Sequence, residues 1–418
     1  MAGRKSSLLN IPLFIFLPFV SFLIAVRNLK SRTNGVIFVL FCTLFGYAFT
    51  FTSTSADSYR VALVFNEYVF KSFTETYQLY LLGGSPDLYR FLCYTLVKSF
   101  TDNPKILLAL FGLVFGLFWY WSYCLFLKEK GSHTDIVISI LVFIFLILNP
   151  ITNINGVRFN TAIWVFMVSS IQIVRYGKLK YFILLFCAPL VHFGFLFGVL
   201  IVVLFSLLKK VLLLDNVLYK WLFYVFVGSF LISWLLSTNV IKFDFISSYI
   251  PSDSISNKIS NYNSDNATLL NERRASGSPF IKLQNFFIGF IKIVVFIIIC
   301  HIRKILKKVP SVAESTKRLH AFVLFYFTLA FVAASVPSGT RFIMVGVIIA
   351  MFFFMNVYIT YFDVLNKKLF MLLIPAFSFK FAFNTIFLTI ALVSKHLWYN
   401  NVFWLIYEGF GYRFIYLE

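Results

Sequence analysis

Two arginines stand where long apolar segments begin, and arginine at such a place is often functional because a charge near a membrane core is costly. Arg158 lies in NPITNINGVRFNTAIWVF, after three asparagines and a glycine, and Arg341 lies in ASVPSGTRFIMVG. A guanidinium offers a planar fork of donors that suits a phosphate, but it also anchors helix ends at a membrane surface. Each residue alone leaves both interpretations open. Two such arginines together favour an anionic ligand.

His192 is embedded in the apolar run CAPLVHFGFLFG. An imidazole can act as a general base near neutral pH, which would suit the activation of a hydroxyl nucleophile. The alternative is a hydrogen bond between two packed helices.

Two polar segments hold further candidates for binding a substrate. Aromatic and carboxylate groups together suit a sugar, although solvated surface loops have a similar composition. The candidates are Asp57, Tyr59, Arg60 and Asp87 in the first segment and Arg273 and Arg274 in the second.

Several signatures of other chemistry are absent from the sequence. It has no glycine-rich phosphate loop, no HExxH, no GxSxG and no DxD pair. The five cysteines are scattered and form no CxxC motif. The sequence therefore predicts neither a metal site nor a cofactor.

The elements that must position these residues are membrane helices. Sixty per cent of the residues are hydrophobic, 13% are charged, and the mean hydropathy is +0.87. A soluble domain has about 25% charged residues. The net charge of +21 would suggest nucleic acid in a soluble protein, but most Lys and Arg lie in short connectors between apolar runs, where they set topology. Nucleic acid is therefore not an expected partner.

The apolar runs predict an all-α, polytopic membrane protein with about 11–12 spans and some short or re-entrant helices. We expect one domain, 1–418, with external segments at about 53–105 and 237–282. Residues 88–100 read as an amphipathic helix at the interface. The runs are 8–26, 35–52, 106–127, 136–149, 159–174, 181–208, 211–236, 283–300, 321–336, 342–360, 369–393 and, more weakly, 402–417.

The distribution of basic residues predicts the orientation. The positive-inside rule places the Lys- and Arg-rich connectors in the cytoplasm. The amino terminus, Arg158 and Arg341 then lie on the external side. The basic connectors are 27–34, 128–135, 175–180, 209–210, 301–320 and 361–368.

Run 181–208 has basic residues at both ends, although about 42 Å of helix is too short for two full crossings. Two short helices that meet near Pro189 and His192 would satisfy the charges as a broken hairpin. The alternative is one long tilted helix.

Several motifs, in this order along the chain, resemble those of the EpsG/Wzy-type bacterial polysaccharide polymerases. Asp57-Ser58-Tyr59 follows the second run, and Ser85-Pro86-Asp87-Leu88-Tyr89 resembles the family's Glu-Pro-Leu-Phe segment. Asn155-Gly156-Val157-Arg158-Phe159-Asn160 resembles its Asn-x-x-Arg-Gln element. His192 matches its His-x-Ser element, with Gly194 in the place of Ser, and Arg341 sits where a late arginine is found.

The resemblance implies a metal-independent glycosyltransferase, multi-pass in the bacterial cytoplasmic membrane. It would join oligosaccharide repeat units carried on undecaprenyl diphosphate, as donor and as acceptor, into O-antigen of lipopolysaccharide or a related surface polysaccharide. Arg158 and Arg341 would hold the leaving diphosphate, and His192 would take the proton of the attacking hydroxyl. Membrane lipid and a chain-length regulator protein would be further partners.

Two other functions fit a protein of this kind. An O-antigen ligase uses the same donor but a different acceptor. A flippase or transporter of the lipid-linked unit would favour inverted repeats and charges along a central path, and no repeat is visible in the sequence.

Overall fold

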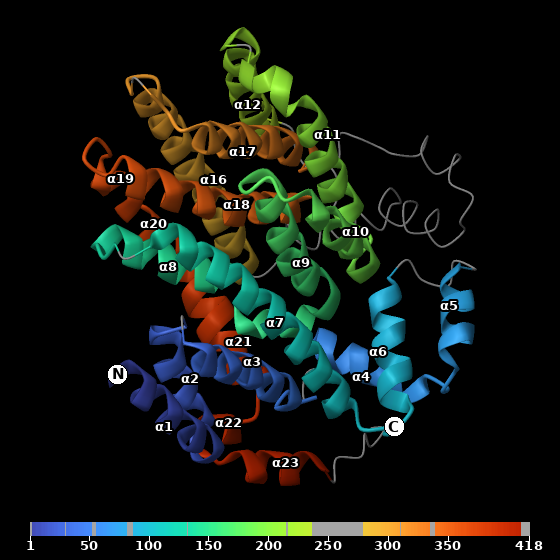
Figure 1. The fold of residues 1–418 in the computed structure, drawn as a ribbon. Helices are drawn as coiled ribbons and strands as arrows, with labels where there is room; N and C mark the ends of the chain where they lie inside the picture. The colour runs from blue at the N-terminus through green and yellow to red at the C-terminus, as the bar shows by residue number, and fades with distance from the viewer. Residues whose placement is uncertain are drawn as a thin grey trace.

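The computed structural model describes residues 2–29, 31–51, 56–81, 87–131, 133–214, 216–235, 279–309, 311–334 and 339–410. These residues form a bundle of helices (Figure 1). Eight helical stretches in these ranges are long and apolar enough to cross a membrane, and shorter apolar helices accompany them. The prediction of an all-α, polytopic membrane protein is confirmed.

The chain forms its helices in the following order. The first part holds α1 (Ala2–Phe16), α2 (Pro18–Arg27), α3 (Arg32–Tyr47), α4 (Asp57–Glu67), α5 (Phe73–Leu81), α6 (Leu88–Lys98) and α7 (Pro104–Lys130). The middle holds α8 (Ile136–Leu148), the 3₁₀ helix η1 (Ile151–Gly156), α9 (Val157–Val174), η2 (Leu179–Tyr181), α10 (Phe182–Val191), α11 (Phe195–Leu214) and α12 (Asn216–Leu235). The last part holds α16 (Pro279–Leu306), α17 (Glu314–Ala333), α18 (Thr340–Thr360), α19 (Lys367–Met371), α20 (Leu373–Lys380), the π-helix η3 (Phe381–Phe387), α21 (Leu388–Leu392), α22 (His396–Tyr399) and α23 (Val402–Phe410).

Glycines bring the backbones of α3 and α7 into direct contact. A Cβ atom on Gly46 would lie 2.2 Å from the carbonyl oxygen of Leu108, and one on Gly112 would lie 2.3 Å from that of Cys42. Small residues allow this close approach, on which helix packing in membranes depends because lipid offers no hydrophobic driving force. The α3–α7 glycine seam therefore lets the two backbones touch, and the rings of Phe38 and Trp119 pack beside it.

Glu129, at the end of α7, connects three helices at one end of the bundle through hydrogen bonds. Its carboxylate accepts from Arg175 Nε (3.1 Å), just after α9, and from Asn356 Nδ2 (3.0 Å), near the end of α18. The predicted cytoplasmic connectors 128–135 and 175–180 therefore lie together at this end. Arg158 and Arg341, at the opposite ends of α9 and α18, share the other face, as the topology predicts.

Run 181–208 is broken at His192, as predicted. α10 ends at Val191, His192 is extended (φ −151°, ψ 115°), and a new helix starts at Phe195. α10 packs against α9, whereas α11 packs against both α9 and α17. The predicted connector at 209–210 is wrong, because both lysines lie inside α11, which continues to Leu214 and is long enough to cross alone.

The first apolar run, 8–26, is not one crossing. Ser21 Oγ of α2 donates to the backbone oxygen of Asn10 in α1 (2.9 Å), and Asn10 Nδ2 donates to Asn34 Oδ1 at the start of α3 (3.2 Å). Residues 11 apart in one straight helix would be about 16 Å apart along its axis, so α1 and α2 fold back on each other at Leu17. The predicted external amino terminus is therefore wrong, because α1 returns to the face where α3 begins.

The last run also departs from a crossing. α23 has nine residues, or about 14 Å of helix, which is half of a bilayer core. Tyr47 Oη donates to the backbone oxygen of Ile406 (2.9 Å), and Asn103 Nδ2 donates to that of Gly409 (2.8 Å). α23 thus lies across the end of α3 and the start of α7. Residues 411–418 are outside the described part.

The two predicted external segments differ in what the structure describes. The first holds α4, α5 and α6, and α6 matches the expected helix over 88–100. It buries Tyr94 and Val97 and exposes Leu92 and Leu96, a pattern suited to a membrane interface. Most of segment 237–282 is outside the described residues.

Candidate active site

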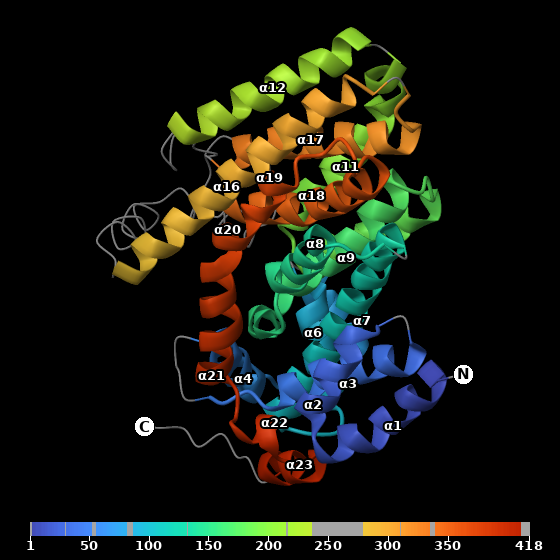
Figure 2. The same ribbon diagram turned by 90° about the vertical axis from the view of Figure 1, so that its left-hand side faces the viewer.

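A cavity of about 750 Å³ opens at the end of the bundle opposite Glu129, within the usual size of a ligand site. Its walls come from α4, α6, the end of α8, η1, α9, α16, α18, α20 and η3. Figure 2 shows α20 above α21 in one column on the left of the molecule. Five basic side chains and one carboxylate are among the described residues that line it. They are Arg60, Arg90, Arg158, Arg341, Lys380 and Asp57.

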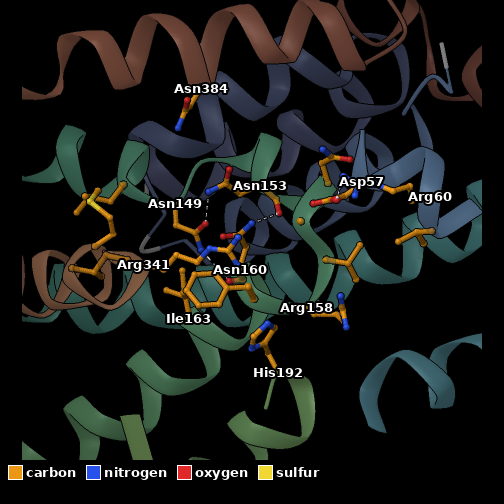
Figure 3. A pocket seen from close by; sticks show the side chains of 18 of the residues that line it. Asp57, Arg60, Asn149, Asn153, Arg158, Asn160, Ile163, His192, Arg341 and Asn384 are labelled. Carbon is orange, nitrogen blue, oxygen red and sulfur yellow. Dashed lines mark hydrogen bonds and ion pairs between the residues drawn. The ribbon is translucent and has the colours of Figure 1, made fainter. Parts of the chain in front are cut away.

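Three asparagines form a closed hydrogen-bonded ring in the cavity wall (Figure 3). Asn153 Nδ2 donates to Asn149 Oδ1 (2.7 Å), Asn149 Nδ2 donates to the backbone oxygen of Asn160 (3.0 Å), and Asn160 Nδ2 donates to that of Asn153 (3.0 Å). Pro150 follows the end of α8, and the 3₁₀ turn η1 takes the chain to α9. The ring thus holds the turn that places Arg158 in the first turn of α9.

Asp87 connects Arg158 to the His192 break. Arg158 Nη1 donates to Asp87 Oδ2, and Asp87 Oδ1 accepts from the backbone N–H of Phe193 (2.9 Å). Asp87 is 1% exposed and does not line the cavity, whereas the Arg158 side chain is 35% exposed and does. Asp87, predicted to bind substrate, is therefore placed behind Arg158.

The His192 ring lines the cavity beside Arg158 (Figure 3). Its Nδ1 accepts from the backbone N–H of Gly194 (3.1 Å), and its ring meets that of Phe159 edge to face at 5.3 Å. A Cβ on Gly194 would lie 3.1 Å from the imidazole, so glycine makes room for the ring. Because Nδ1 accepts, the proton of the neutral ring is on Nε2.

Arg341 lies on the other side of the asparagine ring from Arg158 (Figure 3). It is in the first turn of α18, and its guanidinium lies 5.5 Å from the centre of the Phe159 ring. Phe159 thus contacts both His192 and Arg341. No acidic side chain of the described residues pairs with Arg341.

The predicted candidates near the start of α4 divide into two groups. Asp57 and Arg60 line the cavity and form an ion pair, Oδ1 to Nη2 at 2.8 Å. Tyr59 does not line it and packs against the core instead. Asn155 Oδ1 accepts from the backbone N–H of Ser58 (2.6 Å), which ties α4 to η1. Arg273 and Arg274, the remaining candidates, lie outside the described residues.

Two cations of the cavity were not selected from the sequence as site residues. Arg90, three residues after Asp87, lines the cavity with a buried Nε that has no hydrogen-bond partner. Lys380 ends α20, where the π-helix begins, and Asn384 follows on the same wall. A π-helix often marks a functional site. A lysine within an apolar run was the available signal for Lys380, since such residues are costly.

The cavity chemistry is that of a site for an anion. In the described part of the chain, Arg90, Arg341 and Lys380 have no acidic partner, while Arg158 and Arg60 each have one. Within the same residues, no group of three or more His, Cys, Asp or Glu side chains could hold a metal ion.

The fold and cavity define a polytopic membrane protein with a basic polar site at one end of its helices. The model of the EpsG family matches residues 67–403, and the chain belongs to this family, as its motifs indicated. It is a membrane polysaccharide polymerase. Comparisons with curated proteins and with solved structures found no match. Asp87, Arg158, His192 and Arg341 fall inside the matched range, and Asp57 precedes it.

Proposed function

We propose that the protein joins oligosaccharide repeat units carried on undecaprenyl diphosphate into O-antigen or a related surface polysaccharide. The growing chain leaves its lipid diphosphate and passes to a hydroxyl group of the next lipid-linked unit. The reaction takes place at the outer face of the bacterial cytoplasmic membrane and uses no metal ion.

The observation that carries this proposal is the excess of positive charge in the cavity. Among the described residues, five cations line it, and Asp57 and Asp87 pair with two of these. The three remaining cations suit a ligand with two or three negative charges. Charge builds up on the diphosphate as the glycosidic bond breaks, and prearranged donors stabilise that charge without reorganising. Arg158 and Arg341, on two sides of the asparagine ring, act as these donors. The other cations add to the same field.

The position of the cavity supports a reaction at the outer face of the membrane. It lies at the end opposite to the basic connectors around Glu129, and the positive-inside rule assigns those connectors to the cytoplasm. Asp57 and Arg60 line the same cavity at the start of α4 and contact the sugar. The partners are the lipid-linked donor and acceptor, membrane lipid and a chain-length regulator.

The test is to delete the gene in its host and compare the surface polysaccharide ladder on a gel, with wild type and Arg158→Ala as complements. We expect the deletion to leave single repeat units and only the wild type to restore the ladder. Equal membrane levels of both proteins serve as the control.

Other outcomes of this test identify other functions. Loss of all surface polysaccharide, single units included, would indicate a ligase or a flippase. A wild-type ladder from Arg158→Ala, and from Arg341→Ala, would reject the diphosphate role.

A further inference from the structure

The hydrogen bond from Gly194 to His192 limits what the imidazole can do. A neutral ring has one donor and one acceptor nitrogen. Nδ1 is the acceptor, from the Gly194 N–H at 3.1 Å, so Nε2 carries the proton. To accept a proton from a hydroxyl, the ring would have to give up this bond. The ring thus carries its donor N–H on Nε2 and lines the cavity, and a donor suits a group that gains negative charge.

The carboxylate that lines the cavity within the described residues is Asp57. Its Oδ1 pairs with Arg60 Nη2 at 2.8 Å, and its Oδ2 lies 3.9 Å from the position a Cβ on Gly156 would take. Gly156 is two residues before Arg158, so this oxygen faces the junction that presents the guanidinium. Asp87 is no alternative, because both its oxygens are occupied and the side chain is buried.

We infer that Asp57 is the proton acceptor of the reaction and that His192 is a hydrogen-bond donor to the leaving diphosphate. A carboxylate performs the same task in inverting glycosidases, where it takes a proton from the attacking water. The ion pair with Arg60 orients the carboxylate of Asp57 for this role. The inference rests on the proposed function and departs from the expectation that His192 is the base.

The oxygen of the acceptor hydroxyl forms a bond to the anomeric carbon of the donor sugar. The bond between that carbon and the diphosphate oxygen breaks, and its electron pair leaves with the diphosphate, which His192 and Arg158 stabilise. The hydroxyl proton passes to Asp57 and from there to solvent.

The experiment measures chain growth in isolated membranes that contain the full-length protein, with lipid-linked repeat units extracted from the deletion strain. The variants are Asp57→Asn, His192→Gln and His192→Ala. Glutamine keeps an N–H donor near the position of Nε2 and cannot act as a base. We expect Asp57→Asn and His192→Ala to lose about 100-fold or more in rate, whereas His192→Gln stays within about tenfold of wild type.

Two further variants separate chemistry from positioning. Asp57→Glu should recover part of the lost rate, because it restores a carboxylate. Arg60→Gln removes the ion pair but keeps the base, so it should cost less than Asp57→Asn. If Arg60→Gln costs as much, Asp57 acts through the ion pair and the inference is wrong.

The reverse pattern would also overturn the inference. An active Asp57→Asn with an inactive His192→Gln would make the histidine the base. Membrane levels and melting temperatures of all variants, measured in detergent, exclude misfolding as the cause. Failure of the wild type itself to extend the extracted units would instead reject the proposed function.

Discussion

Asp87 and Arg158 form an ion pair at the edge of the cavity, in which the Asp87 side chain is buried and the Arg158 side chain is partly exposed. The second oxygen of Asp87 accepts from the amide that follows His192. One carboxylate thus sets the position of two groups that come from different helices.

Replacing Asp87 should therefore reduce catalysis although the residue does not line the cavity. Asp87→Ala leaves Arg158 and the Phe193 amide without their partner, and such a loss costs about 1–3 kcal/mol. We expect polymerisation in membranes to fall about 10- to 100-fold. Glu75→Gln is the matched control, because Glu75 is an exposed carboxylate that contacts Ser72. Full activity of Asp87→Ala would show that Arg158 needs no support.

Gly194→Ala should displace the imidazole, because the added Cβ would lie 3.1 Å from two of its ring atoms. We expect about a tenfold loss of rate with little change in the amount of protein in the membrane. Gly228→Ala is the control, since nothing lies within 4 Å of a Cβ there. Equal rates for the two variants would mean that the ring position tolerates the shift.

Lys380→Gln should weaken the binding of the lipid-linked substrate, because it removes one of the cavity cations that have no acidic partner among the residues the structure describes. We expect about a tenfold rise in the substrate concentration that gives half the maximal rate, and near-normal behaviour of Lys380→Arg. Lys220→Gln, on α12 and exposed, is the control. An unchanged concentration dependence would remove Lys380 from the site.

Glu129→Ala should lower stability without changing the site. It leaves Arg175, Tyr176 and Asn356 without their shared acceptor at a largely buried position, and breaking a buried ion pair costs about 3 kcal/mol or more. Thermal unfolding in detergent measures the effect. Glu314→Gln removes an exposed pair with Arg318 and should cost far less. Equal melting temperatures for the two variants would contradict the role of Glu129.

Much of the fold could be predicted because hydropathy and charge act over whole segments. The helix class, the break at His192 and the shared face of Arg158 and Arg341 all follow from apolar length and basic connectors. The fold-back at Leu17 could not be predicted, since run 8–26 has the length of a crossing. A polar contact between Asn10, Ser21 and Asn34 decides it, and such a contact has no signal in a hydropathy profile.

The site could be predicted in part. Arg158, His192 and Arg341 stand out because polar groups at apolar runs are costly, and the structure brings all three to one cavity. Arg90 and Lys380 were not recognised as site residues from the sequence. The position of Arg90 on α6, and the π-helix that begins after Lys380, bring these two side chains to the cavity. Tyr59 looked like a sugar-binding residue but turns to the core, which depends on the local rotation of α4.

The α3–α7 glycine seam has a consequence for how this protein can adapt. Its two helices are held by contacts between backbones and by rings that face the seam, so their outer side chains are free to change with little effect on the geometry of the bundle. Val36, Leu40 and Leu117 are exposed on these helices and can be exchanged for other apolar residues. Changes at these residues alone would thus fit the outer surface of the protein to bilayers of different lipid composition, while the cavity keeps its dimensions.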